Sequence, residues 1–286
     1  MRSTAVFLFC ALLAAPQTRR PGLSTTAITP DPEMARPIDA SASLFIEELT
    51  WLEVRDALRA GKTTAIVATG GVEQNGPYLA TGKHNYVLRV ATEAIARKLG
   101  NTLIAPIVPF VPEGEIAPPT GHMKYPGTIS VRQATFKALL TDIAESLRTH
   151  GFKRVILIGD SGGNQTGMKE VAAELMPKWR GAGAGIYFIP EYYSFYDSGE
   201  LSKWLTAQGI KEVDEGHHDN VAITAMVMAA DPNAARVNQR RAKGKLSING
   251  VKLDPVAKTV AMGHRAIEYR ADVTVAAIRR ALAASK

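Results

Sequence analysis

Four short runs of β-branched and other apolar residues alternate along this chain with longer stretches in which apolar residues recur every three or four positions. The expected strands are residues 63–69, 102–108, 154–158 and 185–189. The expected helices between them are residues 86–99, 136–147 and 164–179. Strands that alternate with helices in this way form a parallel sheet covered by helices on both faces. The pattern therefore predicts an α/β protein with three layers, α/β/α, and a mainly parallel sheet.

The last third of the chain carries weaker signals of regular structure. A helix-like apolar run covers residues 221–230, and a second helical pattern covers residues 273–284. Residues 231–263 show no sustained apolar period and are expected to form an irregular excursion. No internal repeat or low-complexity block divides the chain, so we expect a single domain over residues 40–286.

The N-terminal segment resembles a secretory signal peptide over residues 1–20. Arg2 gives it a positive start, an apolar stretch follows, and small residues precede Pro16. We therefore expect an exported protein, located in the periplasm if the source is bacterial. The apolar run ends at Pro16 and is too short to span a bilayer, so no membrane contact is expected after processing. Cys10 is the only cysteine, and its removal would exclude disulfides, cysteine nucleophiles and thiolate metal ligands.

Positive charge is concentrated near the C-terminus. The chain has 34 Lys and Arg against 27 Asp and Glu, and residues 231–286 hold 12 basic and 4 acidic residues. The cluster of Arg240, Arg241, Lys243 and Lys245 lacks the interleaved aromatic residues of a nucleic-acid surface. We expect no nucleic-acid partner, and we interpret the charge as a solvated face or as a subunit contact in a homo-oligomer.

Polar clusters follow the first and third expected strands. Residues 73–78 and 83–85 come after the first strand, and residues 159–164 come after the third. In an open parallel sheet the loops at the carboxyl ends of the strands gather at one edge, where ligands bind. We therefore expect these loops to face a common cleft.

The first loop contains a carboxylate and an imidazole that can converge. Glu73 and His84 are eleven residues apart across a Gly-Pro turn, and this pairing is common for Zn or Mn. The alternative is a surface glutamate and a histidine that caps a helix. The residues alone leave both interpretations open.

The second loop also has more than one interpretation. Residues 159–163 fit the G-x-S-x-G pattern between a strand and a helix, which makes Ser161 a candidate nucleophile. The same glycines suit a phosphate-binding turn at a helix N-terminus, or a tight turn capped by Asn164.

A third cluster, residues 214–220, reads D-E-G-H-H-D-N and precedes the apolar run. Five of these seven residues can ligate a metal or move protons. The side chains of adjacent His217 and His218 diverge, so only one of them can serve a small site. Glu215 is close enough in sequence to orient either ring.

Four short motifs follow one another between residues 70 and 164. They read E-Q-N-G-P-Y-L from Glu73, H-M-K-Y-P-G-T from His122, S-L-R-T-H-G-F from Ser146, and S-G-G-N from Ser161. In this order they resemble E-Q-H-G-P-H-L, H-x-x-F-P-G-T, S-L-x-x-H-G-F and H-G-G-N of the creatininase (creatinine amidohydrolase) family. The resemblance implies a creatininase-like fold, and the histidine of the family's H-A-G segment falls on His218.

The resemblance also implies a binuclear metal centre, and this chain departs from its ligand pattern. Glu73 is kept, but Asn75 replaces a histidine ligand, His84 replaces the bridging aspartate, and Ser161 replaces a second histidine. His84 is a competent ligand, whereas Asn75 and Ser161 are poor ligands for zinc. We therefore expect one divalent ion, Zn or Mn, rather than two, held by Glu73, His84 and Asp219.

Metal-dependent hydrolysis of a C–N bond in a small amide or cyclic amide is the function that these features favour. His218, helped by Glu215, would carry the proton to the leaving nitrogen. The expected substrate-binding residues are Asn75, His122, Ser161 and Asn164. Two alternatives stay open. One is a serine hydrolase with Ser161 as nucleophile and His218 or His264 as base. The other is a non-catalytic protein that binds small molecules on a creatininase-like scaffold.

Overall fold

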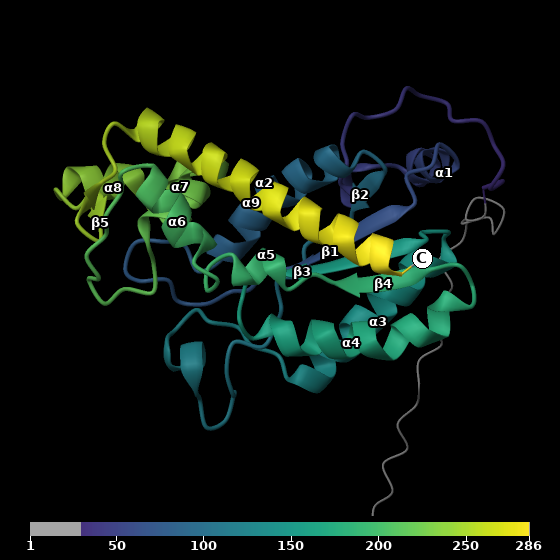
Figure 1. Cartoon of the computed structure of the whole chain (residues 1–286), viewed down its shortest axis with the longest axis horizontal. Helices are drawn as coiled ribbons and strands as arrows, with labels where there is room; N and C mark the ends of the chain where they lie inside the picture. The colour runs from purple at the N-terminus through teal and green to yellow at the C-terminus, as the bar shows by residue number, and fades with distance from the viewer. Residues whose placement is uncertain (1–29, 286) are drawn as a thin grey trace, which may run out of the picture. The chain divides into compact units, whose positions relative to one another are not determined.

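The computed structural model describes residues 30–285 of the chain. The expected signal peptide, residues 1–20, lies outside the described residues. Residues 30–39 contain turns and bends without a helix or strand, and the chain from Ala40 onward forms one compact unit (Figure 1). Within the described residues, no helix combines the length and the apolar character that a membrane span requires.

The centre of this unit is a parallel sheet. Its strands are β1 (Thr64–Thr69), β2 (Thr102–Ile104), β3 (Arg154–Gly159) and β4 (Gly185–Phe188), in the order β2-β1-β3-β4. β1 and β3 pair along their whole length, from Thr64 opposite Arg154 to Thr69 opposite Gly159. Every residue of β1 is buried, as expected for a strand covered on both faces. The predicted parallel sheet is confirmed.

Helices cover both faces of the sheet, because alternate residues of a strand point in opposite directions. On one face, Ile66 and Ala68 of β1 share a core with α2 (Lys83–Leu99) and α9 (Val256–Ala284). On the other face, Val67 shares a core with α3 (Gln133–Thr149) and α4 (Asn164–Arg180). Figure 1 shows these helical layers above and below the strands, so the predicted three-layer α/β/α architecture is also confirmed.

Shorter elements complete the unit. Before the sheet come η2 (Ile46–Glu48) and α1 (Trp51–Arg59), and η3 (Gly121–Lys124) lies between β2 and α3. After β4 come α5 (Glu191–Ser194), α6 (Glu200–Ala207), α7 (Val221–Ala230), η4 (Pro232–Ala235) and α8 (Val237–Ala242). A small antiparallel hairpin of β5 (Ser247–Ile248) and β6 (Val251–Lys252) precedes α9.

Helix α2 begins three residues earlier than its apolar period indicates. The first turn, from Lys83, is polar in sequence and therefore gives no amphipathic signal. Lys83 and His84 are nevertheless only 3% and 5% exposed. Both side chains thus come from a helix that packs on the sheet and not from a loop.

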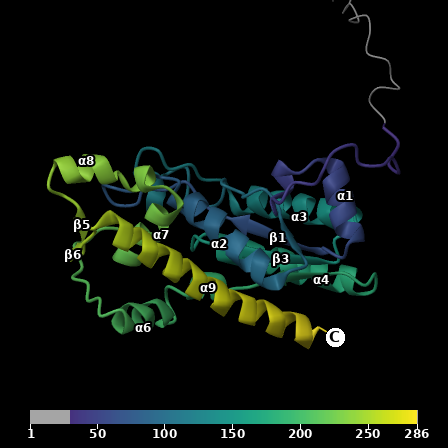
Figure 2. The ribbon, with the colours of Figure 1, turned by 90° about the horizontal axis from the view of Figure 1, so that it is seen from above.

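The expectation of an irregular segment over residues 231–263 is wrong. This segment contains η4, α8, the hairpin and the first two turns of α9. Gly263 of α9 lies so close to α7 that an added Cβ would be 2.0 Å from the carbonyl oxygen of Ala225. Figure 2 shows α9 running alongside α7 and α2. A helix contact made through small residues leaves no period of large apolar residues, and this is why the sequence pattern missed it.

Candidate active site

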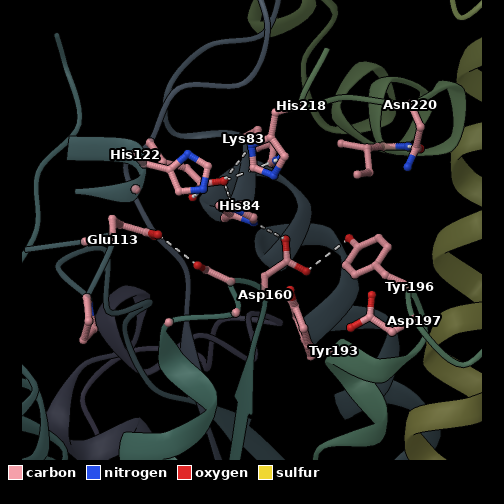
Figure 3. A pocket seen from close by; sticks show the side chains of 18 residues that line it. Lys83, His84, Glu113, His122, Asp160, Tyr193, Tyr196, Asp197, His218 and Asn220 are labelled. Atoms are coloured by element: carbon pink, nitrogen blue, oxygen red, sulfur yellow. Dashed lines mark hydrogen bonds and ion pairs between the residues drawn. The ribbon is translucent and has the colours of Figure 1, made fainter. Parts of the chain in front are cut away.

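A cavity of about 460 Å³ opens where β1 and β3 end (Figure 3). The loop after β1, the first turn of α2 and the loop after β3 all contribute to its walls, so the polar clusters that follow these two strands face one cleft, as the sequence predicted. The segment between α6 and α7 also contributes. The titratable and hydroxyl side chains that line the cavity are Glu73, Lys83, His84, Glu113, His122, Asp160, Ser161, Tyr193, Tyr196, Asp197 and His218.

A buried chain of charged groups runs beneath the cavity. The imidazole of His84 donates from Nε2 to Glu73 Oε1 and from Nδ1 to Asp160 Oδ2, each over 2.8 Å. The other oxygen of Asp160, Oδ1, lies 2.6 Å from a guanidinium nitrogen of Arg270, which is fully buried. These linked charged groups join the loop after β1 to α2, to the loop after β3 and to α9. The position of Glu73 therefore depends on three other elements.

The linked charged groups beneath the cavity determine one another's protonation. Burial opposes ionisation of Asp160, but the guanidinium of Arg270 and the His84 hydrogen bond hold the pKa of this carboxyl below its ordinary value. Burial and the charge of Lys83 oppose protonation of His84, but its hydrogen bonds to Asp160 and Glu73 raise its pKa. Burial also opposes ionisation of Glu73, and the hydrogen bond from His84 lowers its pKa nonetheless. His84 is therefore an imidazolium between two carboxylates.

Glu113 is a third buried carboxyl of the cavity, and no sequence motif pointed to it. Its Oε2 accepts a hydrogen bond of 3.0 Å from Ser161 Oγ. Burial, together with the negative charge of Glu73, raises the pKa of Glu113 to about 9. Its Oε1 lies against Gly71, where an added Cβ would be 2.1 Å away. The residue follows β2 in a Pro-Gly-rich loop, and only its place near a strand end could have pointed to it.

Glu73, His122 and His218 form a cluster with metal-ligand geometry. One ligand atom from each of the three side chains lies within 4.8 Å of the other two. His122 Nε2 is 3.1 Å from Glu73 Oε2, and His218 Nδ1 is 3.6 Å from Glu73 Oε1. The two rings stack with their centroids 4.6 Å apart, and Figure 3 shows them side by side at the cavity. Among the residues that the structure describes, this is the group that could hold a metal ion.

Gln74 positions both histidines of this cluster. Its backbone oxygen accepts a hydrogen bond of 3.2 Å from His218 Nδ1, and its side-chain nitrogen lies 3.5 Å from His122 Nδ1. Burial, followed by the charge of Lys83, lowers the pKa of His218, so these interactions favour the neutral ring that a metal site needs.

The cluster shares only Glu73 with the metal-ligand set expected from the sequence. Both ring nitrogens of His84 already bond to carboxylates. Asp219 is buried, and its Oδ2 accepts from Thr224 Oγ1 over 2.8 Å while its Oδ1 accepts from the Asn220 backbone. Asp219 does not line the cavity. The structure therefore places His84 and Asp219 in supporting positions around the cluster.

The expected substrate-binding residues divide into two pairs. His122 and Ser161 line the cavity, whereas Asn75 and Asn164 lie behind it. Asn75 Nδ2 donates to the backbone oxygen of Glu73 over 2.8 Å, and Asn164 Nδ2 donates to the backbone oxygens of Thr69 and Gly70. Both asparagines hold the loop after β1 in place.

Of the expected proton-transfer residues, His218 faces the cavity and Glu215 does not. Glu215 Oε1 accepts from the Gly250 backbone over 3.1 Å. His217 packs edge-on against Tyr78, away from the cavity. His264 is exposed on α9. Within residues 30–285, no histidine is hydrogen-bonded to Ser161, whose hydroxyl donates to Glu113 instead.

Among residues 30–285, the side chains fit one metal ion and do not fit a second. Glu73, His122 and His218 supply one carboxylate and two imidazoles within reach of a single centre, a common donor set for zinc and similar ions. At the positions where the family resemblance implies further ligands, Asn75 and Ser161 are poor donors and His84 has no free nitrogen.

Comparison with known proteins identifies the family. Residues 47–278 match the sequence model of the family described as creatininase, creatinine amidohydrolase. The chain belongs to the creatininase family. Creatinine amidohydrolase of Pseudomonas putida is 24% identical over 195 residues, which cover 68% of this chain and 74% of the relative. Mycofactocin precursor peptide peptidase of Mycolicibacterium smegmatis is 24% identical over 208 residues, which cover 70% of this chain and 78% of the relative.

Solved creatininases share the fold. A mutant creatininase aligns with a TM-score of 0.63 and 21% identity, over 83% of this chain and 98% of that one. A mutant of "Zn-Zn type" gives a TM-score of 0.61 at 21% identity, covering 84% and 98%. A structure described as "Creatininase Mn" gives 0.58 at 22% identity, covering 84% and 97%. With family membership, the hydrolase relatives make this protein a hydrolase of the amidohydrolase kind.

Proposed function

We propose that this creatininase-family hydrolase uses one divalent ion, zinc or manganese, to cleave a C–N bond of a small amide or cyclic amide. The observation that carries the proposal is the cluster of Glu73, His122 and His218 at the cavity wall, with three ligand atoms within 4.8 Å of one another. Solved relatives described as "Zn-Zn type" and "Mn" support these two metals. When bound, such an ion polarises a carbonyl and lowers the pKa of a coordinated water.

The chain's own residues keep the ligands in position. Arg270 holds Asp160, Asp160 holds His84, and His84 fixes the carboxylate of Glu73. Gln74 fixes the two histidines from the adjacent position. Side chains that orient ligands in this way are as much a part of a metal site as the ligands themselves. The three donors therefore have little freedom before an ion arrives, which reduces the entropy lost on binding.

The remaining polar groups of the cavity suit an amide. The hydroxyl of Ser161 and the carboxyl of Glu113, hydrogen-bonded to each other, line the same cavity as the cluster. The raised pKa of Glu113, about 9, means that its carboxyl carries a proton at neutral pH and can donate a hydrogen bond. A neutral acid and a hydroxyl can together bind the oxygen and the nitrogen of an amide group.

The adjacent histidines provide a matched pair of variants to test the proposal. We expect His218→Ala to reduce metal occupancy and to lower turnover by more than about 100-fold, because loss of a direct ligand exceeds loss of an orienting partner. We expect His217→Ala to leave both unchanged, since His217 packs on Tyr78 outside the cavity. The assay is release of ammonia or amine from a panel of small linear and cyclic amides that includes creatinine.

Metal removal is the second arm of this test. Dialysis against a chelator should abolish turnover, and added zinc or manganese should restore it. Turnover that survives the chelator, together with labelling of Ser161 by a fluorophosphonate, would replace the proposed mechanism with a serine hydrolase. Equal effects of the two histidine variants would also contradict it.

A further inference from the structure

Lys83 is a buried cation in the cavity without a hydrogen-bond partner among the described residues. Its side chain is 3% exposed and lines the cavity. Its ammonium lies 3.7 Å from Glu73 Oε1, which is an ion pair but is too long for a hydrogen bond. Lys83 lines the cavity, so a ligand bound there can supply an acceptor for its ammonium.

The buried charges beneath the cavity are hydrogen-bonded to partners of opposite sign. Glu73 accepts from His84, and Asp160 is paired with Arg270 as well as with His84. Asp197 also lines the cavity but is exposed, so water screens its charge. Lys83 is therefore a buried cation of the cavity wall with an ion pair but no hydrogen bond among the described residues.

Helix stability does not explain a lysine at this position. Lys83 is the first residue of α2, where the positive end of the helix dipole disfavours a cation. The ion pair with Glu73 offsets part of these costs. A cation kept at the start of the helix against burial and the dipole, with one ion pair and no hydrogen bond among the described residues, points to a ligand.

We propose that Lys83 acts in place of a second metal ion and binds a carboxylate group of the substrate, so that the enzyme's substrates are amides that carry a carboxylate. The inference rests on the proposed function. The described residues offer no ligand set for a second ion, because His84 has no free nitrogen and the hydroxyl of Ser161, a poor metal ligand, donates to Glu113. With one divalent ion at Glu73 and the ammonium beside it, the cavity is strongly positive and favours an anionic over a neutral amide. Figure 3 shows Lys83 next to His218 and above His84, at the cluster itself.

Binding of succinamate and succinamide tests this inference, because the two molecules differ by one carboxylate. Isothermal titration with the chelator-treated protein measures both affinities without turnover, and an ammonia assay verifies that neither is cleaved. We expect the wild type to bind succinamate about 10- to 100-fold more tightly than succinamide, as a charge-assisted hydrogen bond to a buried cation provides.

Substitution then assigns the preference to one side chain. Lys83→Met should bring the ratio of the two affinities close to one, because methionine fills a similar volume without charge. Lys83→Arg should keep the preference, and thermal unfolding shows that both variants are folded. Lys258→Met is the matched control, since Lys258 is an exposed lysine in the first turn of α9. Equal affinities in the wild type, or a preference that persists in Lys83→Met, would overturn the inference.

The same pair of molecules separates this inference from the proposed function. In the zinc-loaded protein we compare kcat/KM for succinamate and succinamide. A carboxylate preference that appears only with zinc and persists in Lys83→Met belongs to the metal, and it overturns the role of Lys83 while leaving metal-dependent hydrolysis intact. A preference that is present without metal and lost in Lys83→Met supports the role of Lys83 even if the protein binds no metal.

Discussion

Replacement of Arg270 by methionine tests the buried chain of charges beneath the cavity. Arg270 is fully buried and pairs with Asp160 over 2.6 Å. It also donates two hydrogen bonds to the backbone oxygen of Tyr192 and one to the hydroxyl of Tyr196. Arg270→Met would leave Asp160 buried with His84 as its remaining cation.

The expected loss of folding stability depends on the partners that Asp160 keeps. Removal of one member of a buried ion pair costs about 3–5 kcal/mol, and because His84 still bonds to Asp160, we expect the lower end, about 3 kcal/mol. In a domain of this size such a loss lowers the melting temperature by roughly 6–12 °C. Thermal and urea unfolding at neutral pH, followed by circular dichroism, measure the difference. Arg265→Met is the control, because Arg265 is an exposed arginine on the same helix.

The difference in stability between the wild type and Arg270→Met should change with pH in a definite direction. The pKa of Asp160 is lowered in the folded protein, so its ion pair stabilises the fold above the ordinary aspartate pKa, and this stabilisation is lost as the pH falls through the lower, folded value. In Arg270→Met, burial without the guanidinium favours the neutral acid, so protonation relieves the penalty at acid pH. The difference between wild type and variant should therefore shrink as the pH falls. A variant as stable as the wild type at neutral pH, or a difference that does not shrink, would refute this account of the charges.

Four shorter predictions concern packing, chemistry, metal content and processing. Gly263→Ala should destabilise the protein by about 1–3 kcal/mol in urea unfolding, because its Cβ would meet the carbonyl oxygen of Ala225 at 2.0 Å; Gly181→Ala, with open space around it, should not. Ser161→Ala should retain measurable turnover in the ammonia assay, since its hydroxyl donates to Glu113 and no described histidine bonds to it; complete loss would contradict this. Elemental analysis of purified protein should find one zinc or manganese per chain, and two would contradict the ligand set. In a bacterial host the mature chain should appear in the periplasmic fraction and lack residues 1–20 by N-terminal sequencing, whereas an intact N-terminus would rule out cleavage.

The sequence predicted the strands and the central helices, because their signals are local. The run at residues 63–69 differs by one residue from β1, and the apolar run at residues 221–230 coincides with α7. The start of α2 was missed because its first turn is polar. The beginning of α9 was missed because Gly263 packs through its backbone.

The candidate site was harder to predict than the fold, since its contacts join distant segments. Glu73 and the cleft at the strand ends could be predicted from motif and topology. The geometry groups His122 and His218 with Glu73, although 49 and 145 positions separate them from it in the sequence. Arg270 reaches Asp160 only because α9 extends along the sheet, and no local pattern encodes this pairing. Lys83 was adjacent to a predicted residue but gave no signal of its burial.

The two kinds of support around the cluster have different consequences for how the site can change over evolutionary time. Glu73 is tied through His84, Asp160 and Arg270 to two helices and the sheet. A substitution of one of these buried charged groups therefore disturbs the fold as well as the site. His122 lies in the short η3 segment and His218 in the connection before α7, and both contact Glu73 and Gln74 of the loop after β1. Insertions or exchanges in these two segments can alter the metal and the substrate without unfolding the domain. New specificities in such a scaffold should therefore arise first in the segments that carry the histidines and last in the buried charges.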